Sequence, residues 1–382
     1  MPAMAYARLR RAAPERAGLG GRELAALRDE VDALPGGGWC AGVTVLAGRG
    51  PYVVLEHAAG WALRYSGYDA ESRTGVELPL ARRLPAHQDT VFDLASLTKL
   101  FTALAALQQV ERGRLDLTAE IVRYAPRGVP DHGITVRQLL DHTSGLRPEL
   151  PLYDHPEERR VPLLWEEAPV NPPGSGRCYS DLNLLLLQRV LEQVSGRPLD
   201  ALLHEGVTGP LGMTDTRFRP PADWRPRIAA TEDQRTPWAK VDRGLVHGRV
   251  HDENCWALGG VAGHAGLFST TRDLAVLCRT LLTGGAYGAA RILAPSSVAL
   301  LLDPPGLGFT TDQPYFMGEL AGPLSGGRTA GHTGFTGTSL LLDPVTDTFL
   351  VLLANTVHPV RRPPDSGPRA AAATHLARAV RG

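Results

Sequence analysis

The chain has 382 residues, of which 43% are hydrophobic and 21% are charged, as in an ordinary globular protein long enough for two or three domains. Lysine plus arginine and aspartate plus glutamate each number 40, so the formal net charge is zero. This balance argues against nucleic acid and against an anionic membrane surface as the main partner.

The N-terminal segment and the cysteines bear on the cellular compartment. Residues 1–21 include basic side chains, but the apolar stretch that a signal peptide requires does not follow them. No apolar run reaches the roughly 18 to 20 residues that span a bilayer, so we expect a cytoplasmic protein that does not enter a membrane. The cysteines include no CxxC pair, which indicates reduced, buried thiols rather than disulfides or a zinc site: Cys40, Cys178, Cys255 and Cys278.

The N-terminal third is predicted to form a helix followed by a β-hairpin. Residues 21–34 carry apolar side chains at spacings of three and four, which is typical of an amphipathic helix. Residues 41–48 and 52–60 are rich in β-forming residues and are joined by RGP, which predicts an antiparallel hairpin. Residues 62–90 contain several prolines and turn formers, so we expect an irregular connection there.

The middle third is predicted to be helical. One helix begins at Ser96 and carries apolar residues at spacings of three. Residues 134–146 predict a short helix that ends in a turn, and residues 181–198 predict a longer helix that ends at SG with a proline beyond. Residues 147–162 are polar and rich in proline, so we expect a loop there.

The last third changes character towards strands. Thr270 and Asp273 have the spacing of a capping box, which predicts a helix over residues 269–282. Residues 331–344 and 347–356 predict two consecutive strands joined by the turn DPVT. These strands and the N-terminal hairpin need each other to complete a sheet.

One architecture satisfies this pattern most simply. We expect an α/β (α+β) fold, in which an antiparallel sheet is flanked by helices and an all-helical domain is inserted between its strands. The predicted sheet domain comprises residues 1–95 and 230–382, and the predicted helical domain comprises residues 96–229. The cleft between the two domains is the expected place for an active site.

Ser96 and Lys99 lie three positions apart at the start of the predicted central helix, in the sequence SLTK. A serine at a helix start is commonly a simple N-cap, so its position alone indicates no function. However, residues i and i+3 share one helix face, and a serine hydroxyl becomes a nucleophile when a neighbouring base takes its proton. The chain contains only one other lysine, Lys240, so a chance pairing of this kind is uncommon.

Two further motifs follow along the chain. Tyr179 begins the sequence YSD at a loop-to-helix junction, where a tyrosine can act as a general base if a cation lowers its pKa. His332, Thr333 and Gly334 form HTG on a predicted strand, where polar groups and a close backbone can lie beside a substrate. Either motif alone is compatible with ordinary packing, and only its combination with the serine–lysine pair favours catalysis.

Together the three motifs resemble those of the serine β-lactamase and penicillin-binding protein superfamily, which are S-x-x-K, Y-x-N and K-T-G or H-T-G. The blocks VFDLASLTKLFTA and VHDENCWALGGVAGHAGLFSTTRDL extend the likeness over about residues 36–357, and they resemble class C β-lactamase-like serine hydrolases in particular. The resemblance implies a β-lactamase/transpeptidase-like fold and needs neither a metal nor an organic cofactor.

The resemblance also implies roles for individual residues. It implies Ser96 as the acylated nucleophile, with Lys99 and Tyr179 as its proton-transfer partners. The implied oxyanion hole consists of the backbone N–H groups of Ser96 and Phe335, and two such donors would contribute several kcal/mol.

Two positions depart from the pattern of the family. Asp181 stands where asparagine is usual, and a carboxylate near Lys99 favours the protonated lysine, which leaves Tyr179 as the better candidate base. His332 replaces lysine, and a histidine is mostly neutral near pH 7, so a permanent cation for a substrate carboxylate is missing at that position. We therefore expect esters or amides of low charge rather than efficient β-lactam hydrolysis.

Hydrolases of other classes are weaker interpretations. His247 and His251 have helical i, i+4 spacing with Asp252 adjacent, which makes a partial metal site, but no third ligand is obvious. The G-x-S-x-G sequence of α/β-hydrolases does not occur.

Three functions remain open within the resemblance. Water can resolve the acyl-enzyme, which gives an esterase or amidase for a small molecule, or a second substrate with an amine or alcohol can resolve it, which gives an acyltransferase. A non-catalytic ligand sensor is disfavoured because all three motifs keep reactive side chains. The sequence indicates no oligomeric state.

Overall fold

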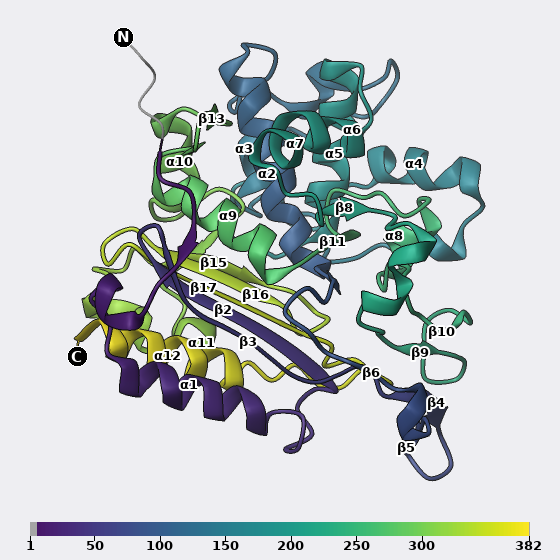
Figure 1. Ribbon diagram of the computed structural model, residues 1–382. Coiled ribbons are helices and arrows are strands. Elements are labelled where there is room, and N and C mark those ends of the chain that lie inside the picture. Colours follow the sequence, from purple (N-terminus) through teal and green to yellow (C-terminus); the bar gives the residue numbers. More distant parts are fainter. Residues whose placement is uncertain (1–5, 382) are drawn as a thin grey trace.

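The structure is a computed structural model that describes residues 6–381 and is built around one sheet (Figure 1). Within these residues eight strands form the sheet, in the order β1–β3–β2–β17–β16–β15–β14, with β6 paired to β3. The neighbours are antiparallel except for β1 and β3. The strands are β1 (Arg10–Arg11), β2 (Gly42–Arg49), β3 (Tyr52–Leu63), β6 (Leu84–Pro85), β14 (Thr310–Thr311), β15 (Ala330–Thr333), β16 (Ser339–Asp343) and β17 (Thr348–Ala354). Because β2 pairs with β17, the N-terminal hairpin and the C-terminal strands share one sheet, as predicted.

Helices cover both faces of this sheet. On one face, α1 (Gly21–Ala33) and α12 (Gly367–Arg381) lie side by side (Figure 1). On the other face, α9 (Thr271–Leu282) packs against β2, β16 and β17. These three strands are buried along almost their whole length because neither face meets water.

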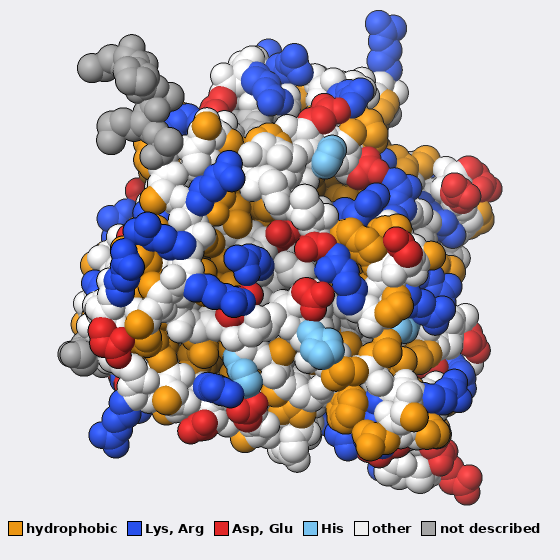
Figure 2. Space-filling view, in the orientation of Figure 1, with side chains coloured by type: hydrophobic (Ala, Val, Ile, Leu, Met, Phe, Trp, Pro, Cys, Tyr) orange, Lys and Arg blue, Asp and Glu red, His pale blue; other side chains and the backbone are white. Residues whose placement is uncertain are grey.

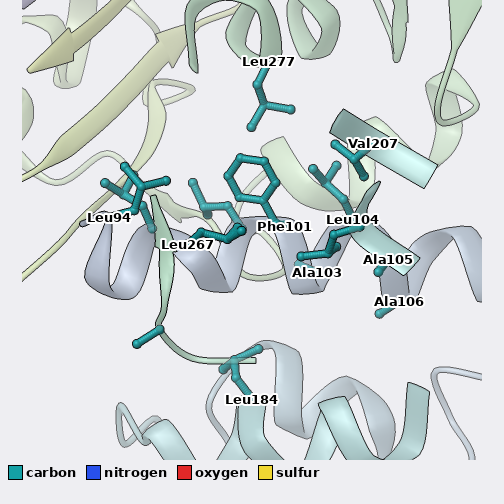
Figure 3. Packing of buried hydrophobic residues seen from close by; sticks show 14 of the residues in the cluster. Leu94, Phe101, Ala103, Leu104, Ala105, Ala106, Leu184, Val207, Leu267 and Leu277 are labelled. Carbon is teal, nitrogen blue, oxygen red and sulfur yellow. The ribbon is translucent and has the colours of Figure 1, made fainter. Parts of the chain in front are cut away.

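The middle of the chain is helical, as predicted, and surrounds α2. Twelve consecutive residues of α2, from Thr98 to Gln109, are buried, so this helix is enclosed on every side. Phe101 points toward Leu277 of α9, whereas Leu184 of α5 lies on the opposite side of α2 (Figure 3). The helices of this part are α2 (Thr98–Glu111), α3 (Val136–Leu140), α4 (Glu157–Glu166), α5 (Asp181–Ser195), α6 (Leu199–Leu203) and α7 (Gly209–Leu211).

A small three-stranded sheet joins distant segments beside α2. β11 (Leu267–Ser269) pairs with both β7 (Phe92–Asp93) and β8 (Arg217–Phe218). The short helix α8 (Glu253–Ala257) lies close by and contacts a 3-10 helix at Leu152–Asp154. Part of the chain beyond residue 230 therefore lies among the helices, and the division into two domains stays a prediction.

Three predicted segments were wrong in detail. Residues 147–162 are not a loop throughout, because they contain a 3-10 helix and the first part of α4, which accommodates Pro162. Residues 62–90 contain a hairpin of β4 (Tyr65–Asp69) and β5 (Thr74–Glu77). The expected single strand over residues 331–344 is divided into β15 and β16, because the chain turns between them where Gly334 N–H bonds to Thr338 O.

Half of the predicted capping box forms at α9. The side chain of Thr270 accepts a hydrogen bond from Asp273 N–H at 3.3 Å. The carboxylate of Asp273 does not return to Thr270, because it accepts hydrogen bonds from Asp215 N–H at 2.9 Å and Thr216 Oγ1 at 2.8 Å. This carboxylate therefore ties α9 to the preceding segment instead.

None of the helices between residues 6 and 381 combines the length and the apolar character needed to cross a bilayer. On the face shown in Figure 2, acidic and basic side chains are interspersed.

Candidate active site

Ser96 lies in a short 3-10 helix, Ala95–Leu97, that leads directly into α2. Ala95 has a φ of 46°, in the left-handed region that residues with a Cβ rarely adopt. The buried carboxylate of Asp93 accepts hydrogen bonds from the backbone N–H groups of Ala95 (2.9 Å) and His251 (2.6 Å), which hold this turn in place. The turn sets Ser96 at the N-terminal end of α2, where it lines a pocket.

Lys99 is almost fully buried one helical turn further on. Its Nζ donates hydrogen bonds to Ser96 Oγ at 2.9 Å and to the carbonyl oxygen of His264 at 3.1 Å, and it lies 2.7 Å from Asp181 Oδ1. Burial lowers the pKa of Lys99, but the neighbouring Asp181 and Tyr179 outweigh burial and raise the pKa above its ordinary value. The lysine is therefore an ammonium that holds the serine hydroxyl.

Tyr179 lies beside this pair in a stack of rings. Its ring centroid is 5.0 Å from Lys99 Nζ, 4.6 Å from the ring of His142 and 5.9 Å from the ring of His332. Burial raises the pKa of Tyr179, the charge of Lys99 lowers it, Asp181 raises it, and the net direction is upward. The phenol therefore keeps its proton at neutral pH unless Lys99 or a substrate stabilises the phenolate.

His142 was not singled out from the sequence, although it lies in the predicted helix-and-turn segment 134–146. Its Nδ1 accepts hydrogen bonds from Ser180 N–H at 3.2 Å and from Asn183 Nδ2 at 3.0 Å, which fixes the turn that carries Tyr179. Burial, together with the charge of Lys99, lowers the pKa of His142 to about 2. It is therefore a neutral support for the Tyr179 ring.

The HTG residues lie where β15 ends at the same pocket. Nδ1 of His332 donates a hydrogen bond to Thr333 O at 2.7 Å, and burial with the charge of Lys99 lowers the pKa of His332 to about 4. A side chain at Gly334 would collide with Thr338 Oγ1 and Leu94 O, at 2.1 and 2.5 Å from its Cβ, so only glycine fits. His332 is therefore neutral at pH 7, as the sequence predicts for a histidine.

Both residues of the proposed oxyanion hole line the same pocket. The pocket has a volume of about 690 Å³, and the predicted site residues that line it are Ser96, Tyr179, His332, Thr333, Gly334 and Phe335. Among the described residues, the backbone N–H groups of Ser96 and Phe335 donate no hydrogen bond. Lys99 and Asp181 join the group through the contacts given above, so all eight predicted site residues gather at one place.

Three arginines on the pocket wall were not anticipated. Arg177 and Arg362 are exposed, whereas Arg369 of α12 is buried, and none of the three forms an ion pair within residues 6–381. Arg369 Nη2 donates a hydrogen bond to Gly334 O at 3.1 Å, on the same peptide group whose N–H belongs to Phe335. Burial lowers the pKa of Arg369 to about 10, so it still carries its charge at pH 7. The signal available in the sequence was the arginine-rich stretch after residue 360.

The partial metal site that was the weaker interpretation of the sequence does not form. His247 and His251 lie outside any helix, so their spacing of four brings no shared face, and each has another partner: Ile228 O at 2.9 Å and Glu232 Oε2 at 2.8 Å. Asp252 pairs instead with His264 at 2.8 Å.

One other group in the described chain has the composition of a metal site. Asp181, Asp252 and His264 offer oxygen and nitrogen atoms that all lie within 4.8 Å of one another. The ammonium of Lys99 lies against Asp181 and already provides the positive charge that a metal ion would supply there. The arrangement thus fits a buried network of charges rather than a bound metal.

Comparisons with known proteins show the family and the fold of the chain. A family model described as Beta-lactamase matches residues 27–375. A protein named "Putative D-alanyl-D-alanine carboxypeptidase" from Salmonella paratyphi A (strain ATCC 9150 / SARB42) is 31% identical, over 94% of this chain and 89% of the relative. Among solved structures, a penicillin-binding protein homolog from Caulobacter crescentus has a TM-score of 0.68 at 21% identity, over 95% of this chain and 98% of the other. The hydrolase EstCE1 has a TM-score of 0.65 at 22% identity, over 94% and 99%. The chain belongs to the beta-lactamase family of serine hydrolases.

Proposed function

We propose that the protein is a hydrolase that cleaves an ester or amide bond of a small molecule through an acyl-enzyme on Ser96. The observation that supports this most directly is the 2.9 Å hydrogen bond between Lys99 Nζ and Ser96 Oγ, at the edge of a pocket shared with Tyr179. This hydrogen bond orients the hydroxyl for attack, and Tyr179 beside it offers a route for the proton.

In the proposed first step, Ser96 Oγ attacks the carbonyl carbon of the substrate. Its proton passes to the Tyr179–Lys99 pair, in which Tyr179 is a phenolate and Lys99 is an ammonium. The carbonyl oxygen becomes an oxyanion and accepts hydrogen bonds from the N–H groups of Ser96 and Phe335, each contributing about 3 kcal/mol. The bond to the leaving group then breaks, and the pair returns the proton to the leaving oxygen or nitrogen. Water attacks the acyl-enzyme in the same way, which releases the acid and restores Ser96.

Tyr179 is the proposed group that receives the serine proton. Asp181 lies 2.7 Å from Lys99 Nζ and raises the pKa of that lysine, so the ammonium is slow to give up its own proton. The same ammonium lowers the pKa of Tyr179 against the effects of burial and Asp181. Lys99 therefore acts as the cation that makes a phenolate accessible.

The wall of arginines favours a substrate that carries a carboxylate near the scissile bond. Arg177 and Arg362 are exposed to the pocket without an ion-pair partner among the described residues, and a carboxylate would supply one. The name of the Salmonella relative refers to a peptide that ends in a D-alanine carboxylate. His332 is neutral and does not take this role, so the cations on the wall revise our expectation of a substrate of low charge.

Acyl transfer is the second candidate, favoured by the shape of the site. A further cavity of about 380 Å³ shares Arg177 and Thr310 with the main pocket and also contains His142. It offers room for an amine or alcohol beside the acyl-enzyme. EstCE1, which has the same fold, is described as a hydrolase with promiscuous acyltransferase activity.

Turnover of a p-nitrophenyl ester by wild type and Ser96→Ala, with and without an added amine, tests both candidates. We expect Ser96→Ala to lose the activity while keeping the fold, and Ser175→Ala, on an exposed loop, to keep it. Formation of acid alone supports the hydrolase, whereas an amide product supports transfer. If no ester, amide or β-lactam is turned over by the wild type, the protein is a ligand sensor and the proposal is wrong.

A further inference from the structure

A second buried ion pair lies next to Lys99 and has no part in the reaction described above. Nε2 of His264 is 2.8 Å from Oδ1 of Asp252, and the His264 side chain is only 1% exposed. Asp252 also caps α8, because its Oδ1 accepts a hydrogen bond from Cys255 N–H at 2.7 Å. The carbonyl oxygen of His264 accepts a hydrogen bond from Lys99 Nζ at 3.1 Å. The pair is thus attached to the proposed catalytic lysine through the main chain.

The charged groups that face this pair come from several elements. Lys99 of α2 and Asp181 of α5 act on His264, and Asp181, Asp252 and His264 present atoms within 4.8 Å of one another. The remaining titratable groups around Asp252 and Lys99 are Asp93 of β7, His142 after α3, Tyr179 before α5, Arg243, Cys255 and His332 of β15.

The two carboxylates nearest Lys99 favour a positive His264. Asp181 and Asp252 are two neighbouring carboxylates with side chains that are each 27% exposed, and Lys99 compensates only one of them. Burial lowers the pKa of His264, but Asp252 and Asp181 outweigh it and raise the pKa overall. Burial likewise raises the pKa of Asp252, and the contact with His264 brings it below its ordinary value. Both shifts have the direction that an imidazolium–carboxylate pair produces.

We propose that Asp252 and His264 are a positioning pair in which the imidazolium compensates Asp252, so that Lys99 experiences the net charge of Asp181 alone. The pair would thereby set the pH at which the Lys99–Tyr179 pair releases the proton that acylation requires. This inference rests on the proposed function of Ser96.

From the charges, we expect substitutions of His264 and Asp252 to have unequal effects on how tightly the Lys99–Tyr179 pair holds its proton. His264→Gln leaves Asp252 uncompensated, so the network becomes more negative and the Lys99–Tyr179 pair holds its proton more tightly. Asp252→Asn removes one negative charge and lets the buried His264 lose its positive charge, so the net charge is unchanged. Asparagine is also a good N-cap, which preserves the start of α8. The double variant is neutral at both positions and should resemble the wild type.

The test is the pH dependence of kcat/KM for p-nitrophenyl acetate in the wild type, both single variants and the double variant. We expect His264→Gln to move the acid limb of the profile upward by about one pH unit, a tenfold lower rate at a fixed pH on that limb. Asp252→Asn and the double variant should lie within about 0.3 units of the wild type, because their net charge is that of the wild type. Nitrogen NMR of the His264 ring should show an imidazolium in the wild type at pH 7 and a neutral ring in Asp252→Asn.

A purely structural role gives a different result. It would lower kcat/KM evenly at every pH, and the limb would stay in place in His264→Gln, which overturns the proposal. An equal shift in His264→Gln and the double variant overturns it as well. If His264→Gln does not fold, a neutral His264 ring in the wild type at pH 7 is sufficient to overturn it. Turnover that survives in Ser96→Ala would instead contradict the proposed function, so the two failures are distinguishable.

Discussion

Two groups of charged side chains, one around Lys99 and one on the pocket wall, differ in how their charges are compensated. In the first, which we call the floor, Lys99 and His264 lie 2.7 and 2.8 Å from Asp181 and Asp252, respectively. The second group, which we call the arginine wall, consists of Arg177, Arg362 and Arg369. None of these cations has a carboxylate partner among the described residues. Arg362 bonds to a backbone oxygen, and Arg369 bonds to a backbone oxygen and a hydroxyl oxygen. A cation that lines a cleft without a counter-ion is a good partner for an anionic ligand, whereas a balanced network is suited to moving a proton. The comparison therefore assigns chemistry to the floor and recognition to the wall.

The largest effect on the acylation rate is expected for a substitution in the floor. Lys99→Met should lower the acylation rate by about 10² to 10⁴, because both the cation and the proton route at Ser96 are lost. Burst kinetics with a p-nitrophenyl ester measure this rate. Lys240→Met, at the other lysine of the chain, is the matched control and should retain full activity. If the Lys99→Met enzyme keeps more than a tenth of the acylation rate, the floor does not carry the chemistry and our distinction between floor and wall is wrong.

Arg369 belongs to the wall but also bonds to the peptide group that carries one N–H of the proposed oxyanion hole. Its guanidinium bonds to Gly334 O, so Arg369→Gln should misplace the Phe335 N–H and lower kcat by about tenfold to a hundredfold. Arg378→Gln, on the same helix but paired with Glu319 at the surface, is the control. An effect on KM alone would show that Arg369 only binds substrate.

A substitution of Arg362 should change substrate binding without changing the chemical step. Among the described residues, its exposed guanidinium bonds only to Gly38 O at 2.7 Å. Arg362→Gln should therefore raise KM about fivefold for a substrate with a carboxylate, the value of an exposed ion pair. The KM for an uncharged ester should not change. Equal effects on both substrates would argue that the wall has a packing role.

The smallest effect concerns pH. His332 has its pKa lowered to about 4, so it gains a proton only as the pH falls through that value and stays neutral from pH 5.5 to 8. The arginines remain charged over the same range. The KM of a carboxylate substrate should therefore change by less than about twofold between these pH values. A rise in KM with a midpoint near 6.5 would mean that His332 itself holds the carboxylate.

The sequence patterns predicted those features of the fold and the site that depend on neighbouring residues and on short motifs. The helix at Ser96, the hairpin of β2 and β3, and the pairing of the two chain ends follow from apolar periodicity and from the need of strands for partners. The motifs named the residues that gather around Ser96. They could do so because the residues of each motif lie within a few positions of one another along the chain.

What could not be predicted depends on contacts between distant segments. Nothing near His264 in the sequence indicates that its ring meets Asp252 while its carbonyl meets Lys99. Arg369 reaches the oxyanion peptide only because α12 packs beneath the sheet, and its alanine- and arginine-rich sequence has little apolar period. The weaker metal interpretation failed for a related reason. A spacing of four residues places two side chains on one face only inside a helix, and His247 and His251 are not in a helix.

The measurement that tests the account most directly is the location of the acyl group. The wild type would be quenched after brief exposure to a p-nitrophenyl ester, weighed intact by mass spectrometry, digested and sequenced. We expect one added acyl group, on the peptide that contains Ser96, and none in Ser96→Ala. An acyl group on a different residue, or an equal adduct in Ser96→Ala, would contradict it.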